Sequence, residues 1–190
     1  ESCKLIKSLS EKLGCSEVRF YAGVGYRHLV VIRNGPDALN TVPPHDIMGK
    51  SIKDNLPTGN DYEKIREIMV QAEPIMVGSC VNSDRIARGE SPANAIWLWG
   101  SGRALDLVPL EEKFGFSGGV ISAVDLVRGI GSSAGLRMVD VPGITGYLDT
   151  NYEGKAQYAL NVLREENFVY IHIEAPDEAG HNGDLEAKVQ

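Results

Sequence analysis

The chain has 190 residues, of which 43% are hydrophobic and 24% charged, enough for one large or two small packed domains. Its formal net charge of −7, with no basic cluster, argues against unaided binding to nucleic acid or to an anionic membrane surface. No apolar run is long enough to span a bilayer, and no leader-like segment begins at Glu1. The three separated cysteines, Cys3, Cys15 and Cys80, lack a paired spacing and indicate reduced structural thiols. We therefore expect a cytoplasmic protein.

The first half of the chain predicts an α+β arrangement. A helical pattern over residues 2–13 ends at Gly14, and "SEVRFYAG" and "YRHLVVIRNG" predict a hairpin or adjacent strands. Residues 36–60 are loop-like, and "NDYEKIREIMVQAE" predicts a helix capped by Asn60 or Asp61. The stretch "CVNSDRIARGESPAN" is polar and predicts irregular structure. We place a domain boundary there, between residues 92 and 93.

The second half alternates strand and helix patterns. "AIWLWG", "GGVISAV", "LRMVDV" and "FVYIHIEA" are four strand candidates. The helical stretches lie between them, above all "YEGKAQYALNVLREEN". Such alternation is typical of βαβ units and a parallel sheet. We expect residues 93–190 to form an α/β layered domain and residues 1–92 a smaller α+β piece.

A candidate metal pair follows the last strand pattern. Asp177 and His181 lie four residues apart in "APDEAGH", so a helical turn would place both on one face. A carboxylate oxygen and an imidazole nitrogen suit Mn²⁺, Zn²⁺, Fe²⁺ or Co²⁺, although two ligands do not complete a site. For this spacing alone, an exposed pair that helps to cap a helix is the favoured alternative. His172, in the strand pattern, is expected to be a hydrogen-bonded core histidine.

Several basic residues are candidate anion ligands because guanidinium groups bind phosphate and carboxylate in a bidentate manner. Taken singly, each is better explained as a solvated surface residue. The candidates are Arg27, His28, Arg85, Arg88 and Arg128.

Longer stretches resemble one family. "PANAIWLWGSG", "ISAVDLVRGIG", "VPGITGYLDTNYEGKA" and "FVYIHIEAPDEAGHNGD" are similar to the cofactor-independent (2,3-bisphosphoglycerate-independent) phosphoglycerate mutases, in the archaeal-type branch also found in bacteria. "GYRHLVVIR", "PPHDIMGK" and "VNSDRIARG" resemble that family's inserted domain. Some bacterial members of the branch have been labelled proposed homoserine kinases, and these motifs do not separate the two activities.

The resemblance implies an alkaline-phosphatase-like parallel-sheet domain and a smaller α+β inserted domain that caps the substrate. It implies two divalent metal ions (Mn, Zn, Mg or Co), no 2,3-bisphosphoglycerate, and a serine that carries the phosphoryl group between 3- and 2-phosphoglycerate. By matching motif, Asp177 and His181 would bind one metal, and Arg85 would bind substrate. Arg27, His28, Arg88 and Arg128 are weaker assignments as substrate ligands.

The termini suggest a central fragment of a longer protein, because the chain begins at Glu1 and stops within a helical pattern. In the family, the nucleophilic serine and the remaining metal ligands lie outside the matching region. We therefore expect no catalytic residue and no bound metal in this piece, and an inactive fragment. The alternatives are a homoserine kinase-like or other small-molecule phosphotransferase or phosphatase, and a non-catalytic binding module. The sequence leaves open whether the protein is an oligomer.

Overall fold

The computed structural model describes residues 1–189, and the chain divides into two compact units. The first extends from Glu1 to Ala104, and the second begins at Leu105. The division therefore falls later than the boundary we expected between residues 92 and 93. Each unit is described separately below.

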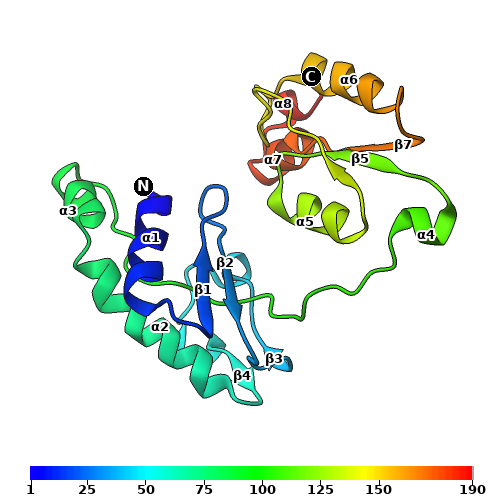
Figure 1. Ribbon diagram of the computed structural model, residues 1–190. Helices are drawn as coiled ribbons and strands as arrows, with labels where there is room; N and C mark the ends of the chain where they lie inside the picture. Colours follow the sequence, from blue (N-terminus) through cyan, green and yellow to red (C-terminus); the bar gives the residue numbers. More distant parts are fainter. Residues whose placement is uncertain (190) are drawn as a thin grey trace. The chain divides into compact units, whose positions relative to one another are not determined.

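The first unit combines short antiparallel strands with helices (Figure 1), which agrees with the predicted α+β character. Strands β1 and β2 form the expected hairpin, with Val18 opposite Ile32. The predicted helices over residues 2–13 and 60–73 are both present. In chain order the elements are α1 (Ser2–Leu13), β1 (Val18–Tyr21), β2 (Leu29–Ile32), β3 (Leu39–Asn40), η1 (Pro44–Ile47), η2 (Lys53–Asn55), β4 (Thr58–Gly59), α2 (Tyr62–Val77) and α3 (Cys80–Ala87).

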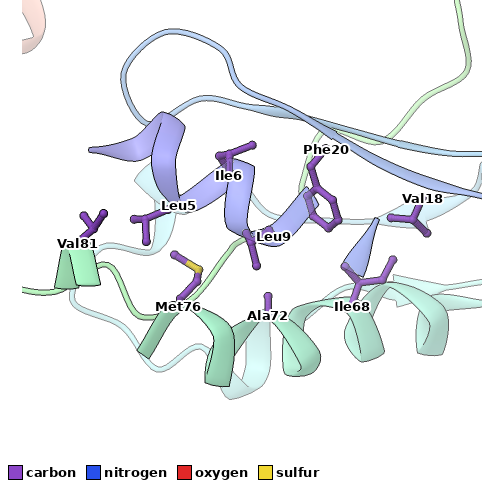
Figure 2. Close-up of a cluster of buried hydrophobic side chains, with 9 residues drawn as sticks. All are labelled: Leu5, Ile6, Leu9, Val18, Phe20, Ile68, Ala72, Met76 and Val81. Atoms are coloured by element: carbon purple, nitrogen blue, oxygen red, sulfur yellow. The ribbon is translucent and has the colours of Figure 1, made fainter. Parts of the chain in front are cut away.

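The core of this unit lies between α1, α2 and the hairpin (Figure 2). Leu5 and Leu9 of α1 stand one turn apart and therefore share the buried face, and Ile68 and Ala72 of α2 do the same. Phe20 contributes the inward face of β1. The helical spacing seen in the sequence is thus explained by a two-helix layer on one side of a hairpin.

Helix α3 corrects the prediction of irregular structure over residues 80–94. The Ser79 hydroxyl accepts a hydrogen bond of 3.3 Å from the Val81 amide and so caps the helix. Val81 and Asn82 are both buried, so a short helix forms although its sequence is mostly polar. Local composition misled the prediction because these two buried residues are enough to anchor one helical face.

The stretch "AIWLWG" at residues 95–100 was wrongly predicted to be a strand of the second domain. It has no strand conformation and counts with the first unit, where Ile96 and Leu98 pack against the core. The Trp97 indole donates to the Val42 carbonyl at 2.8 Å. The apolar side chains of this stretch therefore pack against the core of the first unit, although the stretch does not form a strand.

The second unit contains a small parallel sheet. Its strand order is β6–β5–β7, and β5 pairs in parallel with both neighbours. This confirms the predicted βαβ pattern, with three strands among the described residues in place of the four expected. The elements are α4 (Leu110–Phe114), β5 (Gly118–Ile121), α5 (Asp125–Ser133), β6 (Arg137–Met138), α6 (Tyr152–Val162), β7 (Phe168–Ile171), α7 (Ala175–His181) and α8 (Leu185–Val189).

Helices α5 and α6 lie on opposite faces of this sheet (Figure 1). A Cβ added to Gly119 would lie 3.2 Å from Val162 of α6. Val120, the next residue, faces Gly131 of α5, where an added Cβ would lie 2.8 Å from the Val120 side chain. Successive strand residues point to opposite faces, so the unit has the three layers helix, sheet and helix.

The three parallel strands end at a common edge, the carboxyl edge of the sheet. Strand β7 ends at Ile171, earlier than the Ala175 suggested by the apolar pattern, so His172 lies just beyond the strand. Among residues 1–189, no helix has the length and hydrophobicity needed to cross a membrane.

Candidate active site

A hydrogen-bonded chain of side chains lies at the carboxyl edge of the sheet. Ser122 follows β5 and His172 follows β7, and parallel pairing brings them together. Ser122 Oγ lies 3.3 Å from His172 Nδ1, and His172 Nε2 lies 3.1 Å from Glu174 Oε2. The sequence correctly indicated a hydrogen-bonded histidine at His172. These three side chains are arranged like a serine–histidine–acid triad. Ser122, however, is 0% exposed, so no substrate can reach its hydroxyl group.

Lys155 extends this network from the first turns of α6. It is only 2% exposed, and its Nζ donates to the His172 carbonyl oxygen at 2.8 Å. Burial lowers the Lys155 pKa, and the nearby Glu174 carboxylate partly opposes that shift. Sequence analysis missed this residue because a lysine within a helical pattern is normally on the solvent face. The available signal was its spacing from Ala159 and Val162, which places Lys155 on the apolar face of α6.

Asp177 and His181 converge, as their spacing predicted. Both lie on α7, and Asp177 Oδ2 is 3.3 Å from His181 Nε2. The two side chains are 66% and 77% exposed, so a ligand can approach them from solvent. The Glu174 carbonyl accepts the Asp177 amide at 2.9 Å, which fixes the start of α7. As the favoured alternative expected, the pair is exposed and Asp177 lies in the first turn of the helix, although no side-chain hydrogen bond caps α7.

The donor set of this pair fits a divalent transition metal in part. One carboxylate oxygen and one imidazole nitrogen suit Mn²⁺, Zn²⁺ or Co²⁺. Within residues 1–189, however, no group of three or more histidine, cysteine, aspartate or glutamate side chains could hold a metal ion. Asp177 and His181 could therefore supply only part of a coordination shell.

In the first unit, two predicted anion ligands meet on one carboxylate. Arg85 Nη1 and Arg88 Nη2 each lie 2.6 Å from a different oxygen of Glu1. Hydrogen bonds from Arg85 and then Arg88 lower the Glu1 pKa. Glu90 pairs with Arg88 at 2.9 Å and has a lowered pKa for the same reason. The two guanidinium groups thus form a fork that can hold both oxygens of a carboxylate.

The other predicted anion ligands have local partners. Arg27 lies in the turn of the hairpin and donates to the Tyr26 hydroxyl at 3.3 Å. The His28 ring accepts the Gly23 amide at 3.1 Å, and burial lowers its pKa. In the second unit, Arg128 pairs with Asp140 at 2.8 Å. The structure therefore joins Arg85 with Arg88 but does not join Arg27 and His28 to that fork by any described contact.

The second unit thus has an α/β fold, and its candidate metal ligands lie near the carboxyl edge of a parallel sheet.

A family model described as 2,3-bisphosphoglycerate-independent phosphoglycerate mutase matches residues 1–82. A protein of Geobacter sulfurreducens named "Probable 2,3-bisphosphoglycerate-independent phosphoglycerate mutase" is 50% identical over 190 residues, which cover 100% of this chain and 48% of that protein. A 2,3-bisphosphoglycerate-independent phosphoglycerate mutase of Methanothrix thermoacetophila is 51% identical over 172 residues, 90% of this chain and 44% of that protein.

A solved structure shares the fold. The cofactor-independent phosphoglycerate mutase of Thermoplasma acidophilum superposes with a TM-score of 0.60 at 20% identity, covering 98% of this chain and 52% of that one. Over its whole length the chain is similar to proteins named 2,3-bisphosphoglycerate-independent phosphoglycerate mutase. It spans about half the length of the curated relatives that it matches.

Proposed function

We propose that the intact protein that carries this chain interconverts 3-phosphoglycerate and 2-phosphoglycerate without 2,3-bisphosphoglycerate. The phosphoryl group would pass through a serine of the intact protein, none of the serines described above being assigned this role, and two divalent metal ions would be bound. The observation that carries the proposal is the 50% identity over the whole chain to a protein named for this activity. The reaction belongs to glycolysis and gluconeogenesis, so we propose the cytoplasm as its location.

The two units would have different tasks. We assign the first to the substrate-capping inserted domain and the second to part of an alkaline-phosphatase-like metal-binding domain. The parallel sheet and its helices on both faces support the second assignment. The arginine fork at the C-terminal end of α3 supports the first, because phosphoglycerate has both a carboxylate and a phosphate group.

Arg85 and Arg88 would bind an anionic group of the substrate. The carboxylate of Glu1 already occupies the fork with two contacts of 2.6 Å, which supports its fit to a carboxylate. Because Glu1 and Glu90 neutralise both guanidinium groups, a substrate anion must displace at least one of them. Arg27, His28 and Arg128 would similarly have to exchange Tyr26, Gly23 and Asp140 for substrate.

Asp177 and His181 would hold one of the metal ions. A pair of bound divalent cations stabilises charge on the attacking and leaving oxygens of an in-line phosphoryl transfer. The residues of this chain contribute an oxygen and a nitrogen that already lie 3.3 Å apart and face solvent. Little side-chain rearrangement is needed for both atoms to contact one ion.

The test is turnover by the intact protein. Purified protein with Mn²⁺ and 3-phosphoglycerate, coupled to enolase and free of 2,3-bisphosphoglycerate, should form phosphoenolpyruvate. A parallel reaction with homoserine and ATP should yield no phosphohomoserine. Phosphohomoserine formation without mutase activity would transfer the assignment to a kinase, and inactivity in both assays of a metal-loaded protein would favour a binding module.

The arginine fork is tested separately. Arg85→Ala removes a hydrogen bond between charged groups worth about 1.5–3 kcal/mol, so kcat/KM for 3-phosphoglycerate should fall by roughly 10- to 100-fold. Arg164→Ala is the control, since the exposed Arg164 side chain donates to Asn161 Oδ1 at 3.3 Å, away from the fork residues. Equal kcat/KM in Arg85→Ala and wild type would remove Arg85 from the substrate site.

A further inference from the structure

We propose that Lys155 is a positioning residue whose buried ammonium group fixes the turn between β7 and α7 and thereby sets the geometry of the Asp177–His181 pair. This inference rests on the metal-binding role proposed for that pair. It concerns a residue that neither the sequence pattern nor the family motifs singled out.

Burying Lys155 costs free energy. A lysine that is 2% exposed has lost most of its hydration, which is unfavourable unless protein groups replace the water. Its ammonium has the His172 carbonyl at 2.8 Å, and the Glu174 carboxylate attracts it. A leucine or methionine would pack at this position without that cost, so the charge has a use beyond filling space.

The two partners of Lys155 lie in the same turn. His172 and Glu174 are the first and last of the three residues that connect the end of β7 to the start of α7. The His172 amide also donates to the Ile121 carbonyl at 2.9 Å, which ties the turn to the central strand. Lys155 therefore joins a third element, α6, to a turn that β5 already holds.

The contacts of Glu174 continue into α7. Glu174 holds His172 Nε2 through its side chain and accepts the amides of Asp177 and Glu178 at 2.9 and 3.2 Å through its carbonyl. Helix α7 has seven residues, too few to be stable without tertiary support. The direction of α7, and with it the Asp177 and His181 side chains, thus depends on how firmly Glu174 is held.

Two measurements on the intact protein test this role. In the metal-free protein, Lys155→Met should increase amide hydrogen exchange over residues 172–181 more than over β5. In Mn²⁺ titrations followed by electron paramagnetic resonance, the same variant should bind the ion of the Asp177–His181 site about 10-fold more weakly, the usual effect of losing an outer-shell support. Lys113→Met, at an exposed lysine on α4, is the matched control and should behave as wild type.

The outcomes separate the possibilities. A folded Lys155→Met protein with wild-type exchange and wild-type Mn²⁺ affinity overturns the inference. A lower melting temperature with unchanged Mn²⁺ affinity also overturns it, because Lys155 would then be only structural. If Lys155→Met does not fold, Lys155→Gln keeps a hydrogen-bond donor without the charge, and the same two criteria apply.

Failure of the inference can be told from failure of the proposed function. A wild-type protein that binds Mn²⁺ at Asp177 and His181 but does not turn over 3-phosphoglycerate contradicts the mutase proposal and leaves the role of Lys155 open to the same titration. A wild-type protein that binds no Mn²⁺ contradicts the metal assignment and the inference together.

Discussion

Replacing Asn82 by alanine should strongly destabilise the first unit. Asn82 is 1% exposed and its side chain connects two segments. Its Nδ2 donates to the Met76 carbonyl at 2.6 Å and to the Ala93 carbonyl at 2.8 Å. Its Oδ1 accepts the Ala93 amide at 2.9 Å. This one amide group therefore holds the end of α2 and the segment after α3 together.

The magnitude follows from those three contacts. A hydrogen bond in a folded protein has a net value of about 1 kcal/mol, so Asn82→Ala should lower the free energy of unfolding by about 3 kcal/mol. For a unit of this size the melting temperature should fall by more than about 10 °C. Ser83→Ala is the neighbouring control. Its exposed hydroxyl makes one contact of 3.4 Å, and the expected change is within about 0.5 kcal/mol.

Urea unfolding of the 190-residue chain, followed by tryptophan fluorescence, is the suitable assay. Both tryptophans, Trp97 and Trp99, lie in the segment that Asn82 secures, so their emission reports directly on its attachment. A loss of less than about 1 kcal/mol in Asn82→Ala would refute the view that this segment is part of the first unit's fold.

Three further predictions concern titration, packing and metal. Burial lowers the His28 pKa below its ordinary value of 6.5 in the folded chain. The contribution of His28 to stability should therefore be complete above about pH 6.5 and decline as the pH falls toward the folded pKa. His28→Gln should flatten this decline in stability below about pH 6.5, and an unchanged pH profile would contradict the assignment. Gly119→Ala would place a Cβ 2.9 Å from Val139 and should lower the free energy of unfolding in urea by about 1–3 kcal/mol. The control, Gly129→Ala on α5, meets nothing within 4 Å and should raise the free energy of unfolding by about 0.5–1 kcal/mol. Equal effects of the two substitutions would show that the sheet face is not tightly packed. Adding Mn²⁺ to the 190-residue chain should shift its melting temperature little, because the described residues offer only a pair of ligands, and a shift of many degrees by calorimetry would reveal a fuller site.

The sequence predicted best where a repeating pattern decides the structure. Helix α2 follows from apolar residues such as Ile65 and Ile68 on one face, and the parallel sheet follows from alternating strand and helix patterns. The Asp177–His181 convergence follows from their four-residue spacing within a helix. In each case neighbouring residues along the chain carry the necessary information.

The sequence predicted less well where distant contacts decide. Residues 95–100 have the composition of a strand. Ile96 and Leu98, however, are partly buried against the core of the first unit, and residues 95–100 have no strand conformation. Helix α3 forms in a polar stretch because Asn82 finds its partners at Met76 and Ala93. Lys155 is buried because the crossover from β6 brings the start of α6 to the carboxyl edge, which composition cannot indicate.

The most direct test is the number of Mn²⁺ ions bound by the intact protein, measured by equilibrium titration for wild type, Asp177→Asn and His181→Gln. Both substitutions keep the size of the exposed side chains but remove a charged or imidazole ligand. We predict that each lowers the stoichiometry by one ion per chain while circular dichroism is unchanged. Wild-type stoichiometry and affinity in both variants would contradict the claim that this pair binds a catalytic metal.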